Sequence, residues 1–269
     1  MKLRWVNQAC RNAVDALLPW HCCLCLLPSD QPCALCTCCE ASLTLNNHHC
    51  DRCALPLPVP TTGSTKTLCD SMGASQSQPM HDSQLLCANC LQERSVFTGV
   101  VAPYVYDPAI AYLLRRWKYD RDRVAGRLLM TLWRDATGVL PPVDAVVALP
   151  LNWRRLLYRG FNQADSLRNA LLCNQRTLAT LPAPGFRLKR SHAAKPQVGQ
   201  NAQQRRSNLR GAFTVSGRCD NLRIAVIDDV VTTGATANAA AAALFNAGAR
   251  EVHIWCIART PTPAHTTDV

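Results

Sequence analysis

Long apolar runs are missing from this sequence. No stretch approaches the roughly 20 apolar residues that a membrane helix needs, so no transmembrane segment is expected. Glycine is scarce, with 12 residues among 269, and no heptad pattern persists, which excludes collagen-like and coiled-coil proteins. Arg11 and Asp15 interrupt the apolar positions near the start of the chain. We therefore expect no secretory signal peptide and predict a cytoplasmic protein.

Acidic residues are fewer than basic ones, and the imbalance is confined to one part of the chain. Lys and Arg number 29 against 18 Asp and Glu, a net charge of +11. Residues 1–94 hold six basic and seven acidic residues, whereas residues 95–269 hold 23 and 11. This asymmetry predicts two domains, 1–94 and 95–269. A strongly basic domain indicates an anionic partner, either nucleic acid or a phosphorylated small molecule.

Cysteine is abundant, and 13 of the 16 cysteines lie in residues 1–94. Because the cytosol keeps thiols reduced, metal binding is a better explanation than disulfides. Four C-x-x-C pairs are present, and two such knuckles complete the tetrahedral thiolate shell that zinc prefers. Sequential pairing predicts two structural zinc sites. The first comprises Cys22, Cys25, Cys36 and Cys39, and the second Cys50, Cys53, Cys87 and Cys90.

The register of these knuckles is not unique. Cys33 and Cys36 also have the C-x-x-C spacing, which leaves the ligand set open. His48 and His49 adjoin the third knuckle, but a histidine pair is more often solvated than ligating, so we do not count them as ligands. A closed four-cysteine site has no open position for catalysis, which favours a purely structural role.

Residues 3–18 place apolar side chains at helical spacing and predict a helix, whereas the Ser-, Thr-, Pro- and Gln-rich residues 56–86 predict a flexible insertion. Beyond Phe97, apolar strands alternate with helices. This pattern predicts an α/β fold with a parallel sheet covered on both faces, where ligands bind beyond the carboxyl ends of the strands. The predicted strands are 99–106, 143–149, 223–227 and 251–257, and the predicted helices are 108–117, 122–136, 162–173 and 235–247.

The most informative segment follows the apolar residues 224–227. Two carboxylates, Asp228 and Asp229, leave the strand, and a turn rich in threonine leads to an Ala-rich helix. Free N–H groups and the dipole at a helix N-terminus favour phosphate, and Gly234 permits close backbone approach. The carboxylates can accept hydrogen bonds from sugar hydroxyls, so the segment suits a ribose 5-phosphate. The simpler interpretation is an acidic strand end followed by a threonine cap.

Two further basic segments stand out. Arg154, Arg155 and Arg159 follow the strand 143–149, where a basic surface helix is the alternative to a phosphate site. Residues 190–210 contain five basic residues, six amides and no acidic residue, and such a loop repels itself unless an anion joins it. Its alternative interpretation is a nucleic-acid-binding patch.

The segment VIDDVVTTGAT resembles the phosphoribosyl diphosphate (PRPP) motif of type I phosphoribosyltransferases. The wider pattern resembles the ComF/GntX family, whose members join an N-terminal double zinc ribbon to a domain of that type. The matching blocks are the cysteine knuckles, LLRRWKYDRD, ALPLNWRRLLYRGFNQA, QNAQQRRSNLRGAF and residues 223–237. The long insertion 56–86 and the surplus cysteines depart from the family pattern.

The resemblance implies a site for PRPP with Mg²⁺, which bridges pyrophosphate oxygens and stabilises the leaving group. Asp228 and Asp229 would be the catalytic residues and hold the ribose hydroxyls, and residues 190–210 would form a lid. Arg159 would lie toward pyrophosphate, and Lys118 would contact a phosphate unless it is a surface lysine. The 5-phosphate would be held by Thr232, Thr233, Gly234, Ala235 and Thr236.

Two functions remain open at this point. One is a phosphoribosyltransferase, a pentosyl-transferring enzyme of nucleotide salvage or DNA utilisation. The other is a DNA-binding or regulatory factor that retains the PRPP site, because relatives in this family are associated with natural competence. Such a factor would bind single- or double-stranded DNA or the competence machinery. The acceptor nucleophile and the oligomeric state do not follow from the sequence.

Overall fold

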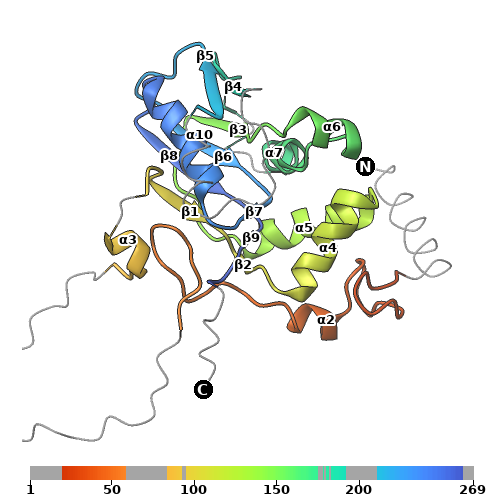
Figure 1. The fold of residues 1–269 in the computed structure, drawn as a ribbon. Coiled ribbons are helices and arrows are strands. Elements are labelled where there is room, and N and C mark those ends of the chain that lie inside the picture. Colours follow the sequence, from red (N-terminus) through yellow and green to blue (C-terminus); the bar gives the residue numbers. More distant parts are fainter. Residues whose placement is uncertain are drawn as a thin grey trace, which may run out of the picture.

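A computed structural model describes residues 20–58, 84–92, 95–174, 178, 180–181, 183–191 and 211–262 (Figure 1). The predicted helix over residues 3–18 lies outside the described residues. So do most of the predicted insertion 56–86 and most of the basic segment 190–210. None of the helices in the described part of the chain has the length and hydropathy needed to cross a lipid bilayer.

A sheet of four parallel strands forms the centre of the molecule (Figure 1). Its inner strands are mostly buried and apolar beyond their first residues, apart from His253, because helices cover both faces of the sheet. The order across the sheet is β1 (Gly99–Val101), β8 (Glu251–Trp255), β6 (Arg223–Ile227) and β3 (Ala145–Ala148). The predicted parallel α/β fold is therefore confirmed.

A second, smaller parallel sheet continues the first. Its order is β2 (Tyr104–Val105), β9 (Ala258–Arg259) and β7 (Val230–Val231), and each strand closely follows a strand of the central sheet along the chain. The segment 99–106, predicted as one strand, is thus divided between two sheets, and the predicted strand 251–257 corresponds to β8, which ends at Trp255 before β9. Asp228 and Asp229 lie at the step between β6 and β7, rather than at the end of the last strand before the turn.

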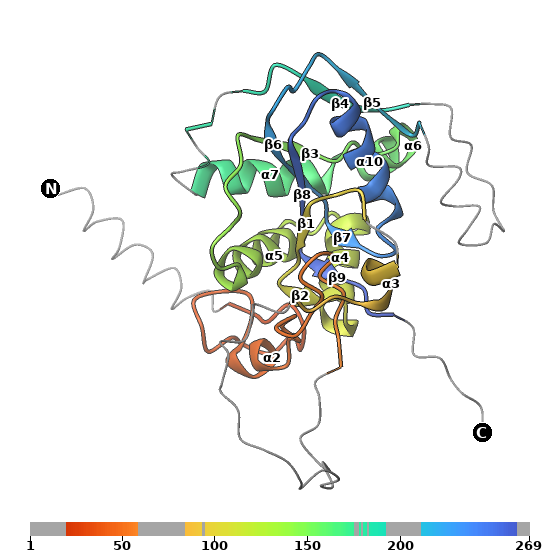
Figure 2. The same cartoon turned by 90° about the vertical axis from the view of Figure 1, so that its left-hand side faces the viewer.

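Two helices cover opposite faces of the central sheet (Figure 2). Helix α7 (Gln163–Asn174) packs against β3 and β6, and α10 (Ala235–Asn246) packs against β8. Helix α7 begins where predicted, because the Asn162 side chain accepts a hydrogen bond from the Ala164 N–H at 3.2 Å. The small side chains of α10 allow its backbone to lie close to the sheet.

Helices α4 (Pro108–Tyr119) and α5 (Arg123–Ala136) pack against each other and confirm the two predicted helices of this region. Aspartate caps both N-termini. The Asp107 carboxylate accepts a hydrogen bond from the Ile110 N–H at 2.8 Å, and the Asp122 carboxylate accepts from the Val124 N–H at the same distance.

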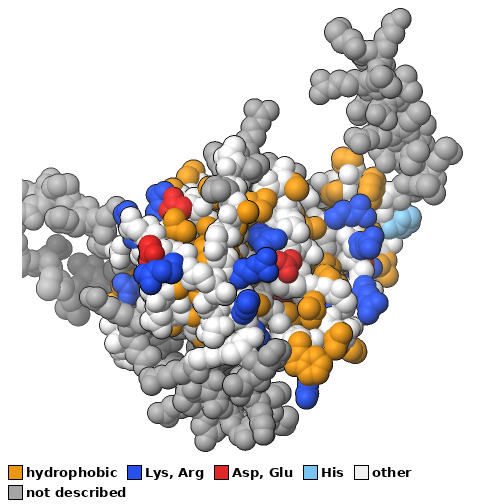
Figure 3. Space-filling view, turned by 90° about the horizontal axis from the view of Figure 1, so that it is seen from above, with side chains coloured by type: hydrophobic (Ala, Val, Ile, Leu, Met, Phe, Trp, Pro, Cys, Tyr) orange, Lys and Arg blue, Asp and Glu red, His pale blue; other side chains and the backbone are white. Residues whose placement is uncertain are grey.

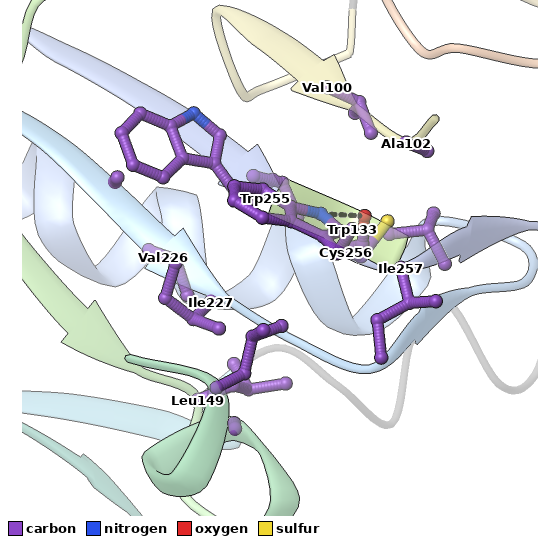
Figure 4. Close-up of a cluster of buried hydrophobic side chains, with 14 of the residues drawn as sticks. Val100, Ala102, Trp133, Leu149, Val226, Ile227, Trp255, Cys256 and Ile257 are labelled. Atoms are coloured by element: carbon purple, nitrogen blue, oxygen red, sulfur yellow. Dashed lines mark hydrogen bonds between the residues drawn. The ribbon is translucent and has the colours of Figure 1, made fainter. Parts of the chain in front are cut away.

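Two tryptophans fill the core where the two parallel sheets meet (Figure 4). The Trp133 indole N–H donates to the Cys256 carbonyl at 2.7 Å, and the ring centroids of Trp133 and Trp255 are 6.4 Å apart. Both residues are fully buried. This packing fixes the connection between β8 and β9, and the Trp255 carbonyl in turn accepts a hydrogen bond from the Asp228 N–H at 2.9 Å.

The remaining elements lie at the periphery of the sheet. Helix α6 (Trp153–Arg159) was not predicted in full, and it ends at Gly160 with φ +80°. Strands β4 (Arg187–Arg190) and β5 (Phe213–Ser216) form an antiparallel hairpin stem on either side of the basic segment. Among the described cysteine-rich residues, the helices are α2 (Thr37–Ala41) and α3 (Ala88–Gln92).

The cysteine-rich segments pack directly on the α/β domain. The Arg116 guanidinium donates to the Cys23 carbonyl at 2.9 Å. The buried Asn46 amide donates to the Ala102 carbonyl at 3.0 Å and to the Ala54 carbonyl at 2.8 Å. These hydrogen bonds attach the cysteine-rich residues to α4 and to the segment that follows β1.

Candidate functional site

The acidic pair at the step between β6 and β7 is held by both backbone and side-chain contacts. The Asp228 carboxylate accepts a hydrogen bond from the Asp229 N–H at 2.8 Å. The Lys118 ammonium, from α4, forms an ion pair with the Asp229 carboxylate at 2.8 Å, and both side chains are less than one-fifth exposed. The structure thus brings together three of the predicted site residues and assigns Lys118 a partner.

Burial and charge repulsion act together on Asp228. Burial, followed by the negative charge of Asp229, raises the pKa of Asp228 to about 7, whereas the Asp229 N–H, Lys118 and Arg190 oppose the shift. The pair therefore carries an incomplete negative charge near neutral pH. Hydroxyl donors or a cation brought by a ligand would stabilise the ionised form of Asp228.

Arg190 is a residue that the sequence analysis did not place in the site. It ends β4, and its guanidinium lies 5.4 Å from the centre of the Phe213 ring across the hairpin. Burial lowers the pKa of Arg190, and Arg155 lowers it further, whereas Asp228 raises it. The hairpin pairing that brings Arg190 into electrostatic reach of Asp228 has no signature in the local sequence.

The turn after β7 is open to an anion. Gly234 caps α10 with φ +78°, and no side chain caps the helix from that position. Thr232 and Thr233 are exposed, and the Thr233 hydroxyl accepts only a long hydrogen bond, 3.4 Å, from the Ala235 N–H. A 12-residue helix whose first N–H group makes only this long hydrogen bond to a side chain suits a phosphate group.

Arg259, on β9, binds the backbone at the start of this turn. The sequence analysis did not identify it as a site residue. The side chain is buried and donates to the carbonyls of Val231 and Thr260, each at 3.0 Å, and to the carbonyl of Thr232. Its Nε donates to the Cys53 carbonyl at 3.0 Å. All of these contacts are with carbonyl groups, so the charge of the buried Arg259 is not neutralised by them. It adds positive potential next to the turn.

The eight cysteines predicted as ligands form two clusters. Within each cluster the sulfur atoms lie within 4.8 Å of one another, close enough to hold one metal ion. Cluster 1 contains Cys22, Cys25, Cys36 and Cys39, and cluster 2 contains Cys50, Cys53, Cys87 and Cys90. The alternative register through Cys33 is not adopted, because its thiol donates to the Leu35 carbonyl instead.

The first knuckle of each cluster has the same backbone form. Cys22 and Cys50 donate N–H hydrogen bonds of 2.9 Å to Leu27 and Leu55, and isolated bridges join His21 to Pro28 and His49 to Pro56. Although burial raises thiol pKa values, backbone N–H groups outweigh it and lower the pKa of Cys22 to about 6 and that of Cys50 to about 7. Burial instead raises the pKa of Cys39 and Cys53, so one thiol in each cluster has a stabilised thiolate. Four convergent thiols are nevertheless a donor set suited to zinc.

The four-cysteine clusters differ in burial. All members of cluster 2 are buried, whereas cluster 1 has one buried, one exposed and two half-buried cysteines. The His48 and His49 rings bond to the carbonyls of Leu57 and Asn46, which agrees with their exclusion as ligands. Cluster 2 also lines a cavity of about 490 Å³ that reaches Gly234 and the start of α10.

The contacts of Arg159 in the described residues are with groups other than the acidic pair. Its buried guanidinium donates to the Gln163 side chain at 3.0 Å and to the Tyr119 hydroxyl at 3.4 Å, and it lies 5.1 Å from the centre of the Tyr119 ring. The structure therefore brings Asp228, Asp229 and Lys118 together, and places Arg159 beyond the end of α4.

No protein-family model matches the chain. The DNA utilization protein YhgH of Escherichia coli is 32% identical over 210 residues, covering 74% of this chain and 87% of the relative. Competence protein F of Haemophilus influenzae is 33% identical over 184 residues, covering 64% of this chain and 78% of the relative. The competence protein ComFC of Streptococcus pneumoniae is 26% identical over 242 residues, with coverage of 88% and 92%.

Among solved structures, a purine phosphoribosyltransferase from Pyrococcus horikoshii Ot3 is similar to this chain at 19% identity. The match covers 53% of this chain and 74% of that chain, with a TM-score of 0.26.

Proposed function

Because the chain belongs to the ComF family of competence and DNA utilisation proteins, we propose that its acidic pair and the following turn bind PRPP with Mg²⁺. The observation that carries this proposal is the juxtaposition of the Lys118–Asp229 ion pair with Asp228 and an uncapped helix. Asp228 and Asp229 accept hydrogen bonds from the ribose hydroxyls. The turn from Thr232 to Thr236 receives the 5-phosphate, and Arg259 favours the phosphate through its buried charge.

The bound Mg²⁺ supplies charge neutralisation at the pyrophosphate oxygens. Lys118 has a complementary role, since it already meets Asp229 at 2.8 Å and can turn to a phosphate oxygen when the ribose occupies the carboxylates. Arg190, the last residue of β4, adds a second cation within electrostatic reach of Asp228. Arg159, which donates to Gln163 and Tyr119, stays a prediction for pyrophosphate.

The proposed reaction is pentosyl transfer. An acceptor nucleophile forms a bond to C1 of the ribose as the C1–oxygen bond breaks, and pyrophosphate leaves with the bonding electrons. The test is pyrophosphate release from PRPP across a panel of nucleobases and amines. Release with one acceptor and none without it supports an enzyme of salvage or DNA utilisation. Tight PRPP binding without release supports a regulatory role for the same site.

We further propose that residues 1–94 form a domain that holds two structural zinc ions, one in each cysteine cluster, in the reducing cytoplasm. The donor set fits zinc, because each of the two clusters provides four convergent thiols. Metal analysis of freshly purified protein should give about two zinc ions per chain, and a chelator should unfold the cysteine-rich residues before the α/β domain. Disulfides in place of zinc would contradict this proposal.

A second candidate function, binding of single-stranded DNA, is favoured by the surface of α6. Trp153 and Tyr158 are 50% and 72% exposed, and the Arg154 guanidinium lies 5.3 Å from the centre of the Trp153 ring. Aromatic and arginine side chains side by side suit stacked bases and phosphates. Replacing Trp153 and Tyr158 by Ala should weaken binding of an oligonucleotide, while the control Tyr106→Ala should not.

The two candidates also differ in what should protect the basic segment 190–210 from trypsin. A lid over the phosphosugar site is protected by PRPP with Mg²⁺, and a DNA surface is protected by DNA. In the second case the affinity for DNA falls steeply with salt. The logarithm of the binding constant decreases with the logarithm of salt concentration by about 0.7 to 0.9 per phosphate neutralised.

A further inference from the structure

A cavity of about 600 Å³ lies among α4, α5, α6 and the start of α7, outside the proposed phosphosugar site. We call it the arginine cavity, because four arginines line it: Arg121, Arg123, Arg127 and Arg159. Trp117 and Phe161 contribute aromatic surface, and no acidic residue is among the lining side chains. We propose that the arginine cavity binds a nucleoside diphosphate or triphosphate.

The four arginines are not neutralised by the protein. In the described ranges none of them lies within 4.0 Å of a carboxylate, whereas neighbouring Arg116 pairs with Asp122 at 2.6 Å. Arg121 donates to the Tyr158 carbonyl at 3.3 Å, and Arg127 donates to the Arg123 carbonyl at 3.4 Å. Most of their N–H groups therefore have no protein acceptor among these contacts.

Concentrated positive charge of this kind favours a ligand with more than one phosphate. The planar guanidinium group donates two parallel hydrogen bonds to phosphate oxygens, and several such groups around one cavity share a chain of phosphates. Figure 3 shows one face of the molecule, on which lysine and arginine side chains outnumber acidic ones. A diphosphate or triphosphate distributes its charge over several of the cationic groups.

The wall of the cavity adds recognition of a planar ring. The ring centroids of Trp117 and Phe161 lie 6.1 Å apart at an angle of 41°. Gly126 allows this arrangement, since a Cβ atom at that position would lie only 2.5 Å from the Trp117 indole nitrogen. Aromatic rings and guanidinium planes are both suitable surfaces for stacking a base.

A buried amide beside Arg159 also has spare hydrogen-bonding capacity. Gln163 is 1% exposed, and its side-chain oxygen accepts from Arg159 at 3.0 Å, while its Nε2 has no partner within the described part of the chain. Arg159 thus contacts Tyr119, through both its ring and its hydroxyl, and the Gln163 amide, whose N–H groups have no partner in the described residues. Such a buried polar group is costly unless an acceptor joins it.

The arginine cavity and the acidic pair are separate sites on two sides of α4. Trp117 lines the cavity, whereas the next residue, Lys118, pairs with Asp229. The lining residues include neither Asp228, Asp229 nor the turn from Thr232 to Thr236. The proposal for the cavity therefore does not depend on PRPP binding, and the two can fail independently.

The test is calorimetric titration with ADP of the wild type and of Arg123→Gln/Arg127→Gln. Both arginines are exposed, so this variant should fold normally. We expect ADP binding to weaken at least tenfold. The control variant Arg134→Gln/Arg218→Gln removes the same charge from exposed ion pairs outside the cavity and should bind ADP within twofold of wild type.

Further titrations separate the sources of affinity. Asp228→Asn/Asp229→Asn should retain ADP binding, and Phe161→Leu should lose part of it while binding pyrophosphate unchanged. The proposal is overturned if Arg123→Gln/Arg127→Gln binds ADP like the wild type, or if pyrophosphate alone binds as tightly as ADP. Displacement of ADP by PRPP would likewise assign the cavity to another class of ligand. So would displacement by a single-stranded oligonucleotide at a phosphate concentration lower than that of the bound ADP.

Discussion

The Arg259 guanidinium donates from Nε to the carbonyl of Cys53 at 3.0 Å, across 206 positions of sequence. The same side chain donates from its terminal nitrogen to the carbonyls of Val231 and Thr232, at the start of the turn before α10. One buried cation therefore joins a knuckle of cluster 2 to the turn before α10. This connection gives a physical reason for the cysteine-rich segment to accompany the proposed phosphosugar site.

Removing that cation should weaken both regions that it connects. Arg259→Ala leaves the buried carbonyls of Cys53 and Val231 without this donor, so we expect the free energy of unfolding to fall by about 3 kcal/mol. PRPP affinity should fall about tenfold as the turn loses its support and its positive potential. The exposed Arg250→Ala serves as the control. Unchanged stability and unchanged affinity in Arg259→Ala would refute the connection.

Loss of a cluster 2 ligand should also affect the turn before α10, because Arg259 connects the two. Cys53→Ser should reduce zinc from about two ions to about one per chain and lower stability, because structural zinc contributes folding free energy. PRPP affinity should fall more in Cys53→Ser than in Cys25→Ser, which belongs to cluster 1. The exposed Cys38→Ser lies outside both clusters and should keep two zinc ions. Equal effects of Cys38→Ser and Cys53→Ser would argue against the ligand set.

The raised pKa of Asp228 predicts a pH dependence of stability. Its protonated form is favoured in the folded state, so its contribution is complete below its ordinary pKa of 3.8 and is lost as pH rises through about 7. Asp229, Lys118 and Arg190 surround it, and Cys256 does not titrate in this window because burial raises its pKa. Asp144 does not either, because Arg223 holds its pKa at about 2.

The measurement compares the wild type with Asp228→Asn by chemical unfolding between pH 4 and pH 8. The stability of the wild type relative to the variant should fall by about 1 to 3 kcal/mol over this range. The difference between the two proteins cancels the titration of histidines and cysteines that both share. A stability difference independent of pH would contradict the raised pKa of Asp228.

Substitution of Gly234 should lower the stability of the protein because of its left-handed backbone conformation, rather than through a clash with neighbouring atoms. Its φ is +78°, but an added Cβ would meet only Phe97, at an ordinary 3.8 Å. Gly234→Ala should therefore cost about 1 to 2 kcal/mol of stability through the left-handed conformation, with a larger cost for Val. It should also weaken PRPP binding by shifting the turn. Gly234→Asn should recover most of the stability, and Gly138→Ala, in open space, should be neutral.

Much of the fold followed from periodicity in the sequence. The apolar residues of β6 and the Asn162 cap of α7 specify these elements locally, so both were predicted within a residue or two. The division of 99–106 into β1 and β2 was not predicted, because it depends on the step between two sheets around Pro103. The eight cysteines form the two predicted clusters because each C-x-x-C knuckle is a local unit. Combining knuckles that are consecutive in the sequence keeps the connections between them short.

The contacts that complete the candidate site are long-range and were not predictable. Arg259 reaches Cys53 through the order of strands β2, β9 and β7, and the pairing of β4 with β5 brings Arg190 into electrostatic reach of Asp228. Arg159 shows the opposite case. Its motif suggested a phosphate residue, but α6 places it against Tyr119 and Gln163, in the arginine cavity.

The central claim is that Asp228 and Asp229 hold the ribose of PRPP, and calorimetric titration of Asp228→Asn/Asp229→Asn with PRPP and Mg²⁺ tests it most directly. We expect a folded variant, perturbed only by the loss of the Lys118 ion pair, whose PRPP affinity is at least about 100-fold weaker than that of the wild type. Asp135→Asn/Asp220→Asn removes the same charge from exposed positions and should bind normally. Affinity of the acidic-pair variant within about threefold of wild type, a difference of roughly 0.7 kcal/mol, would contradict the claim.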